Sequence, residues 1–197
     1  MYKKIWLFAF SFVLLVSGLY PIQSTAASIG FQKEGQLLSK KLSAVVIKDI
    51  AFDWTKPSGG AYPDLKANNK VAIYVSMAAQ RVKIMQDDKV IYTMVTSSGV
   101  DGSKATSTPR GHYKIENERG KWFYSPKYQE GAKYWTSWKN HGEFLFHSVP
   151  MDASGNVKVK EAMKLGKEAS HGCFRLTIPD AKWINEHIPV GTDVYIR

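Results

Sequence analysis

The chain has little cysteine, few acidic side chains and no internal repeat. Cys173 is the only cysteine in 197 residues, which excludes an intramolecular disulfide framework and a zinc site built from several thiolates. Asp and Glu number 17 against 27 Lys and Arg, so the formal net charge is +10. The chain is nevertheless 44% hydrophobic and 13% aromatic, which is too rich in core formers for a disordered or collagen-like polymer. These numbers predict one folded domain.

The N-terminus holds the longest apolar run. Lys3 and Lys4 precede a run from Ile5 to Val16 that only Ser11 interrupts, and small residues follow at 24–26. This order is typical of a secretory signal peptide. Extended to residue 20, the run would form about 24 Å of helix, which is shorter than a hydrocarbon core of about 30 Å. We therefore expect cleavage after residues 1–26 rather than an uncleaved membrane anchor, and an exported protein.

An exported basic protein meets a restricted set of partners. The leader carries two positive charges and no negative one, so the protein stays basic after cleavage. Its counter-charges would be anionic wall polymers, lipid head groups or acidic substrates, and nucleic acid is not expected. An equally good interpretation is that the charge only keeps the domain soluble. Contact with a membrane is expected only if the leader stays attached.

Residues 27–69 give mixed signals. Leu38, Leu42 and Val45 fit a helical stripe, but residues 45–47 fit a strand equally well. The stretch 56–64 is rich in Pro and Gly, which is typical of a turn-rich linker. We assign 27–69 to an N-terminal spacer of unknown role and expect the compact domain over 70–197.

A period of two dominates the chain from Val71 onward. Short alternating or apolar runs between turn residues predict strands at 71–76, 81–85, 90–96, 112–116, 144–146 and 194–196. A Lys-rich loop with a helical turn near 159–165 interrupts them. Thr177, Pro179 and Asp180 are typical of a helix start, and we expect that helix to end near His187. The sequence thus predicts a mainly β fold with a short C-terminal helix.

The segment 120–140 contains seven aromatic residues without a clean period of either kind. These rings either cap the sheet and fill a small second core, or form a wall or lid over a cleft. Trp135 and Trp138 are the candidate substrate contacts in the second case.

Cys173 is the candidate nucleophile. A lone cysteine is often a small buried hydrophobe, but this one lies in the polar and flexible string Ser170-His171-Gly172-Cys173-Phe174-Arg175. The thiolate is the reactive form, and neighbouring imidazolium or guanidinium groups lower a thiol's pKa. The setting therefore favours catalysis over packing.

Among the five histidines, His147 is the best candidate for the base. It follows the apolar run 144–146, which would place it on rigid backbone, and Ser148 could orient its ring through the carbonyl or the hydroxyl. His171 more simply shapes the turn or contacts substrate. The amides of 171–173 could form an oxyanion hole, for which Gly172 allows close approach, and Arg175 has a fork suited to a carboxylate.

These residues resemble a known family. Phe146-His147-Ser148 followed by the Ser170–Arg175 string is similar to the signature of the L,D-transpeptidase (YkuD-type) catalytic domain of bacterial cell walls. Further similarities are Gln80, Gly99, the string Thr108-Pro109-Arg110-Gly111-His112-Tyr113 and the final Gly191-Thr192-Asp193-Val194. The resemblance covers about residues 71–197 and implies a β-sandwich or barrel with an active-site loop. Ser148 stands where many members have Gly, and 26 positions separate the two catalytic candidates, which implies an enlarged loop.

The resemblance also implies roles. Cys173 would be the acyl-accepting nucleophile, His147 its base and Ser148 the residue that orients the base through its backbone carbonyl. His171 and Gly172 would belong to the oxyanion environment, Ser170 and Arg175 to the loop and the substrate contacts. No metal and no organic cofactor is expected.

The implied reaction takes place on peptidoglycan stem peptides outside the cytoplasm, in the cell wall. Cys173 would attack the amide between the third stem residue and the terminal D-Ala, and an amine would resolve the thioester into a 3-3 cross-link. Water as the acceptor would instead give L,D-carboxypeptidase activity, and carbapenems should acylate the thiol. A sortase or an NlpC/P60-type peptidase fits the order and spacing of the motifs poorly. A metal site of His147, His171 and Cys173, or a wall-binding protein without activity, remains as a further alternative.

Overall fold

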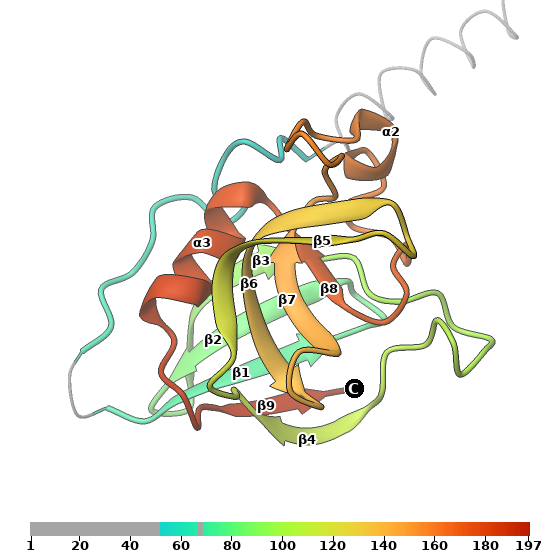
Figure 1. The fold of residues 1–197 in the computed structure, drawn as a ribbon. Coiled ribbons are helices and arrows are strands. Elements are labelled where there is room, and N and C mark those ends of the chain that lie inside the picture. Colours follow the sequence, from blue (N-terminus) through green and yellow to red (C-terminus); the bar gives the residue numbers. More distant parts are fainter. Residues whose placement is uncertain (1–51, 67–68) are drawn as a thin grey trace, which may run out of the picture. The chain divides into compact units, whose positions relative to one another are not determined.

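The computed structural model describes residues 52–66 and 69–197 (Figure 1). The leader expected over 1–26, and the part of the spacer before residue 52, lie outside these residues. In the part of the chain that the structure describes, no helix is both long and apolar enough to span a bilayer.

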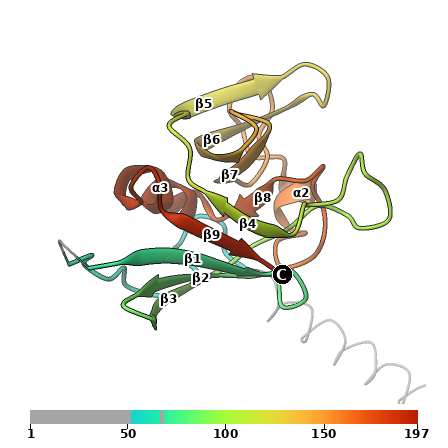
Figure 2. The same cartoon turned by 90° about the horizontal axis from the view of Figure 1, so that it is seen from below.

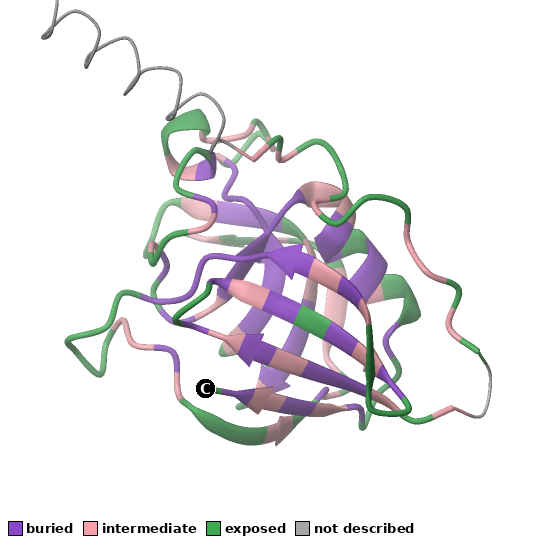
Figure 3. Cartoon of the chain, turned by 180° about the vertical axis from the view of Figure 1, so that it is seen from behind, coloured by how far each residue is buried: buried purple, intermediate pink, exposed green. Residues whose placement is uncertain are grey.

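One sheet has five strands in the order β3-β2-β1-β9-β4. The strands are β1 Val71–Ser76, β2 Arg81–Gln86, β3 Lys89–Val95, β4 Gly111–Lys114 and β9 Asp193–Ile196. β1, β2 and β3 form an antiparallel meander, and the C-terminal strand β9 inserts between β1 and β4, parallel to β1. Buried and more exposed residues alternate along these strands because only one face meets the core (Figure 3).

The second sheet has four strands in the order β5-β6-β7-β8. They are β5 Arg119–Ser125, β6 Glu130–Lys139, β7 Phe144–Ser148 and β8 Phe174–Leu176. β8 pairs parallel to β7, which sets His147 opposite Arg175. Figure 2 shows the two sheets as separate layers. The loop that carries Cys173 leads directly into β8, so the register of this sheet brings it next to the strand that carries His147.

The core lies between the sheets and under the C-terminal helix. α3 (Ile178–His187) packs on β6 and β7, and Thr177 caps it by accepting a hydrogen bond from the Asp180 N–H at 3.2 Å. Phe146 and Phe174 stack at the centre of the core, with ring centroids 5.2 Å apart. The second helix, α2 (Val159–Ala162), is a single turn between β7 and β8. The expected mainly β fold with a short C-terminal helix is confirmed.

Three strands were not expected from the sequence. β5 is mostly exposed or half-buried, so it has no hydrophobic alternation to detect. β6 has a register shift between Ser137 and Lys139 and a left-handed backbone at Tyr134 (φ 56°), and both features break a period of two. β8 has three residues, all buried, which is too short to show a period.

Residues 52–66, expected to belong to the spacer, pack on the domain. The hydroxyls of Ser58 and Tyr62 donate to the buried Asp180 carboxylate at 2.5 and 2.8 Å. The carbonyl of Trp54 accepts from the Ile178 N–H at 2.9 Å, at the start of α3. Because these bonds satisfy groups at the N-terminus of α3, the structure differs here from a linker that stands apart from the domain.

Candidate functional site

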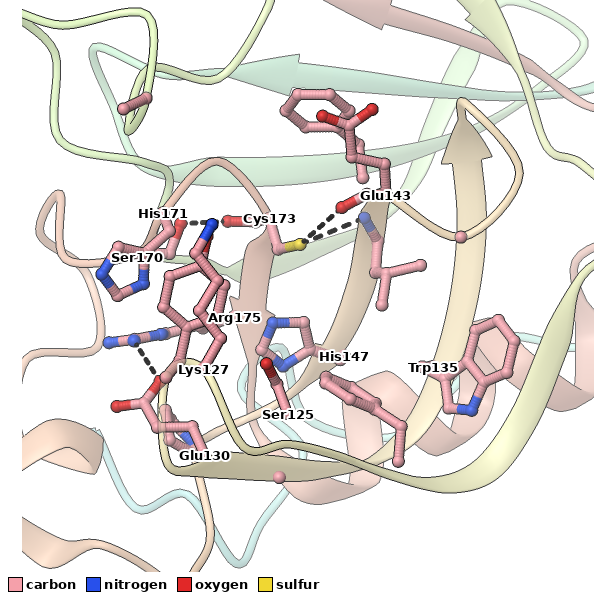
Figure 4. Close-up of a pocket in the computed structure, with 18 of the residues that line it drawn as sticks. Ser125, Lys127, Glu130, Trp135, Glu143, His147, Ser170, His171, Cys173 and Arg175 are labelled. Atoms are coloured by element: carbon pink, nitrogen blue, oxygen red, sulfur yellow. Dashed lines mark hydrogen bonds and ion pairs between the residues drawn. The ribbon is translucent and has the colours of Figure 1, made fainter.

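A pocket of about 700 Å³ lies where the β5–β6 hairpin faces the loop before β8 (Figure 4). Cys173 and His147 both line it, as do the hairpin residues Ser125, Lys127, Tyr128 and Glu130. The sequence-predicted residues Ser170, His171, Arg175 and Trp135 line it too. The pocket therefore collects most of the predicted site from three separate parts of the chain: β6, the end of β7 and the segment 170–175.

Cys173 is partly exposed and lies at the end of a tightly held loop. The Ser170 hydroxyl donates to the Cys173 carbonyl at 2.5 Å and accepts from the Gly172 N–H at 3.1 Å. Gly172 has a φ of +123°, and a Cβ there would lie 2.8 Å from the Phe144 ring. Only glycine fits this position, because L side chains rarely adopt that φ and the ring leaves no room. The loop thus fixes the nucleophile just before β8.

Motif residues distant in sequence support the same loop. The Thr108 hydroxyl donates to the Gly172 carbonyl and accepts from the Gly99 N–H, both at 2.8 Å. The Gln80 side-chain amide donates to the Ser98 hydroxyl and accepts from the Ser98 N–H, both at 2.8 Å. The Ser98 carbonyl in turn accepts from the Ser170 N–H at 3.0 Å. These polar groups are buried and paired, so they hold the backbone on both sides of the loop in one arrangement.

His147 is 7% exposed and sits near the end of β7. Its Nδ1 lies 2.6 Å from the Ser148 carbonyl oxygen, which accepts only from a protonated nitrogen. Nδ1 therefore carries the proton of the neutral ring, and Nε2 keeps the lone pair that a general base needs. Burial and the nearby Arg175 guanidinium lower the pKa of His147 to about 4, so the ring is neutral at pH 7.

Ser148 acts on His147 through its backbone. Its hydroxyl is used elsewhere, because it accepts from the Lys133 N–H at 2.9 Å and donates to the Val149 carbonyl at 3.0 Å. The side chain is fully buried and ties β7 to β6. Of the two ways in which Ser148 could orient the ring, the carbonyl is the one that the structure forms.

The sulfur of Cys173 is turned toward the start of β7. It accepts from the Leu145 N–H at 3.3 Å and donates to the Glu143 carbonyl at 3.5 Å (Figure 4). Among the described residues it forms no hydrogen bond with His147. Burial raises the pKa of the thiol to about 11, against the smaller lowering effects of the Leu145 amide and the Arg175 charge. The expectation that neighbouring cations lower this pKa is therefore outweighed by desolvation, and thiol and imidazole are both neutral at rest.

Arg175 is 3% exposed and neutralised by two carboxylates. One terminal nitrogen lies 3.0 Å from Glu130 at the start of β6, and the other lies 2.9 Å from Glu161 in α2. The two acids come from segments 45 and 14 positions away in the sequence. Neither glutamate was predicted from the sequence, because glutamates in a polar loop and at a strand end give no local signal of a shared partner.

The predicted substrate contacts differ in placement. The guanidinium of Arg175 and the hydroxyl of Ser170 are engaged within the protein, so what the geometry supports is a role in holding the loop. Trp135 does line the pocket. Trp138 does not: it is 1% exposed and packs in the core, 5.6 Å from the Phe174 ring between centroids. Its suggested contact with substrate is thus corrected, because the Trp138 side chain is enclosed by the rings of Phe144, Phe146 and Phe174.

One cluster in the described part of the chain has the spacing of a metal site, namely Glu116, Glu118 and His141. None of the three lines the pocket. His141 Nδ1 lies 2.8 Å from the Glu118 carboxylate, and Glu116 accepts from the His141 N–H at 2.9 Å. These bonds account for the cluster without an ion. The suggested grouping of His147, His171 and Cys173 is not a cluster of this kind.

The comparisons with known proteins agree with one another. The family model for the L,D-transpeptidase catalytic domain (YkuD) matches residues 70–196. The chain is 48% identical over 190 residues to the Bacillus subtilis (strain 168) protein named "Putative L,D-transpeptidase YciB", covering 93% of this chain and 97% of that protein.

Solved structures share the fold. An L,D-transpeptidase from Mycobacterium smegmatis superposes with a TM-score of 0.52 at 20% identity, over 66% of this chain and 59% of that one. One from Mycobacterium tuberculosis H37Rv has a TM-score of 0.52 at 18% identity, over 66% and 58%. LdtMt1, solved in complex with imipenem, has a TM-score of 0.52 at 18% identity, over 66% and 59%. The chain spans less than two thirds of those chains, and at these identities the likeness shows the fold alone.

Proposed function

Since the chain belongs to the L,D-transpeptidase (YkuD) catalytic domain family, we propose that it is an exported cysteine acyltransferase. Its donor is a peptidoglycan stem tetrapeptide, and its product is a 3-3 cross-link between stems. The observation that carries the proposal is that the chain's only thiol and a histidine whose Nδ1 is fixed to the Ser148 carbonyl line the same pocket.

The first half-reaction forms a thioester. As the Cys173 sulfur attacks the carbonyl carbon of the L,D amide, its proton passes to His147 Nε2, and the carbonyl oxygen takes up the negative charge. The tetrahedral intermediate then breaks its C–N bond, and the imidazolium returns the proton to the leaving D-Ala nitrogen. The thiol has to turn from the Glu143 carbonyl toward the ring for this transfer. No charge is created before the substrate binds, because both groups start neutral.

The second half-reaction transfers the acyl group. His147 takes a proton from the acceptor amine as the nitrogen attacks the thioester, and the departing sulfur recovers a proton from the imidazolium. One amide is exchanged for another, so no cofactor has to supply energy. Partial exposure of Cys173 also admits water, and hydrolysis of the thioester is the competing L,D-carboxypeptidase reaction.

The oxyanion of the intermediate needs donors near the sulfur. The Gly172 N–H already donates to the Ser170 hydroxyl. We therefore assign the stabilisation of the oxyanion to the backbone N–H groups of His171 and Cys173, and Gly172 provides the turn that orients them.

The proposal is tested by intact-protein mass after incubation with imipenem. We expect one adduct on the wild type and none on Cys173→Ala, with circular dichroism showing that both are folded. His147→Ala should keep the thiol and form the adduct at least a hundredfold more slowly, as expected from loss of a general base. A folded wild type without an adduct would refute the assignment.

Two further measurements separate the finer parts of the proposal. Turnover of a stem tetrapeptide with and without an acceptor amine distinguishes cross-linking from hydrolysis by the mass of the product. Export is tested by the mass of the protein recovered outside the cell. A mature chain that begins near Ala27 supports cleavage of the leader, and a full-length chain in the cytoplasm contradicts it.

A further inference from the structure

The charged side chains that line the catalytic pocket differ in whether they already form ion pairs within the protein. Of the pocket's carboxylates, Glu130 pairs with Arg175 at 3.0 Å, and Glu143 keeps its negative charge while it accepts a hydrogen bond from the neutral Asn140 side chain at 2.6 Å. Its exposed lysines, Lys104 and Lys127, form no ion pair with any described residue. The unpaired positive charge that this pocket offers to an anionic ligand therefore comes from these two lysines.

Lys127 is the lysine placed beside the nucleophile's loop. It lies in the turn between β5 and β6, next to Tyr128, and the Tyr128 ring stacks on His171 with centroids 4.3 Å apart and planes 19° apart. His171 is two positions before Cys173. The Lys127 ammonium lies 5.0 Å from the Tyr128 ring, a cation–π distance that holds it near this contact. In Figure 4 the Lys127 side chain extends from the hairpin toward the loop of Ser170 and Cys173.

The donor peptide brings one carboxylate close to the sulfur. In a tetrapeptide the D-Ala that leaves is the C-terminal residue, so its carboxylate is one residue beyond the carbonyl that the sulfur attacks. One extended residue spans at most about 3.6 Å. The charge that recognises it therefore has to come from the part of the pocket wall adjoining the Cys173 loop, which is where Tyr128 and His171 meet.

We propose that Lys127 forms a carboxylate subsite that holds the C-terminal carboxylate of the donor peptide and so restricts the enzyme to peptides that end one residue after the attacked amide. The inference rests on the proposed function and deepens it. Lys127 makes no contribution to proton transfer in this account. It selects the donor, and it aligns the leaving residue before His147 delivers the proton to the leaving nitrogen.

The test compares three forms of a stem tetrapeptide with diaminopimelate at position three: all carboxylates free, only the C-terminal carboxylate amidated, and only the diaminopimelate side-chain carboxylate amidated. The readout is kcat/KM for release of D-Ala or its amide. An ion pair with an exposed lysine predicts that C-terminal amidation slows wild type by up to about fivefold. Lys127→Gln should lose the same factor on the free carboxylate and none on the C-terminal amide, so that its preference falls to about one. Lys127→Arg should restore the preference.

Two controls make the result specific. Lys121→Gln changes an exposed lysine of the same hairpin that does not line the pocket, and it should behave as wild type. Lys104→Gln should retain the preference. The inference is overturned if Lys127→Gln slows all three peptides equally, if the preference moves with Lys104, or if it follows the side-chain carboxylate. Failure of the proposed function looks different, because wild type would then release D-Ala from none of the peptides and form no imipenem adduct.

Discussion

The ionisation of Cys173 in the free protein is open to a direct measurement. Burial raises the pKa of the thiol to about 11 and, with the Arg175 charge, lowers the pKa of His147 to about 4. An ion pair of thiolate and imidazolium would require the reverse order of the two pKa values. The structure therefore predicts a neutral pair at every pH between about 4 and 11, and a thiol that ionises only at alkaline pH.

The size of the effect follows from the pKa. At pH 7 the thiolate fraction is about 10⁻⁴, a hundredfold below that of a thiol with its ordinary pKa of 9.0. A more basic thiolate is more nucleophilic, with a Brønsted coefficient of about 0.4–0.5, which recovers about tenfold for two pKa units. Alkylation of Cys173 at pH 7 should thus be about tenfold slower than that of an unperturbed thiol, and its rate should rise about tenfold per pH unit up to at least pH 10.

The chain is well suited to this assay because it contains a single thiol. The rate of the iodoacetamide adduct is followed by intact mass from pH 5 to 10, with Cys173→Ala as the blank. His147→Ala should give nearly the same profile, because the ring is neutral over this range and adds no charge to stabilise a thiolate. A pH-independent rate below pH 7 that disappears in His147→Ala would show an ion pair and refute the reasoning.

The acylation step should lose its rate at a much lower pH than alkylation does. His147 can act as a base only while it is neutral, a form that predominates above its pKa of about 4 and is lost as the pH falls through that value. Acylation by a substrate should therefore persist well into the acidic range, in contrast to alkylation of the free thiol.

Three further predictions concern the scaffold. Trp138→Ala removes a core side chain and should lower the free energy of unfolding in denaturant by about 3–5 kcal/mol. Trp135→Ala should lower it by less than about 1.5 kcal/mol and should instead raise KM for the donor peptide. Equal losses of stability in the two variants would contradict the placement of Trp138 in the core and Trp135 at the pocket. Gly172→Ala forces a side chain into a left-handed backbone against the Phe144 ring and should abolish imipenem acylation in a protein that still folds, as judged by circular dichroism; an active variant would show that the loop adapts. Asp180→Ala removes the acceptor of the bonds from Ser58 and Tyr62 and should cost about 2–4 kcal/mol and expose residues 52–66 to limited proteolysis, whereas an unchanged digestion pattern would show that these bonds do not hold the segment.

The sequence was informative where one physical signal dominated. β1, β2 and β3 each bury one face of a sheet, so their alternation was visible, and Thr177 with Pro179 predicted the start of α3 that the structure has. β5 was missed because its residues are all exposed or half-buried, and β6 because a register shift and the left-handed backbone at Tyr134 interrupt its period, so the hairpin has no regular pattern. The spacing of turn residues was not enough to recover it.

The residues of the candidate site also fall into those that could be predicted from the sequence and those that could not. The local string around Cys173 and the end of an apolar strand at His147 were readable, because each lies in a setting unusual for its residue type. The residues that set the charge around the catalytic pair could not be predicted in this way. Glu130 and Glu161 meet Arg175 only through the pairing of strands and the folding of the loop, and the loss of solvent around the sulfur is a property of the whole pocket.

The long segment between His147 and Cys173 shows what such partners do. A flexible loop becomes only slightly more costly as it lengthens, about 0.6 kcal/mol for each doubling, so extra length alone is tolerated but positions nothing. Here the segment is fixed: Glu161 of α2 pairs with the buried Arg175, and Ala162 and Leu165 pack with Val95 and Val149. Since Arg175 lies opposite His147 in the sheet and its charge acts on both catalytic groups, the enlarged loop is coupled to the chemistry through this one guanidinium. The carboxylates of Glu130 and Glu161 neutralise the positive charge of Arg175. Without them, that charge would lower the pKa of His147 further and oppose the imidazolium that each half-reaction has to form.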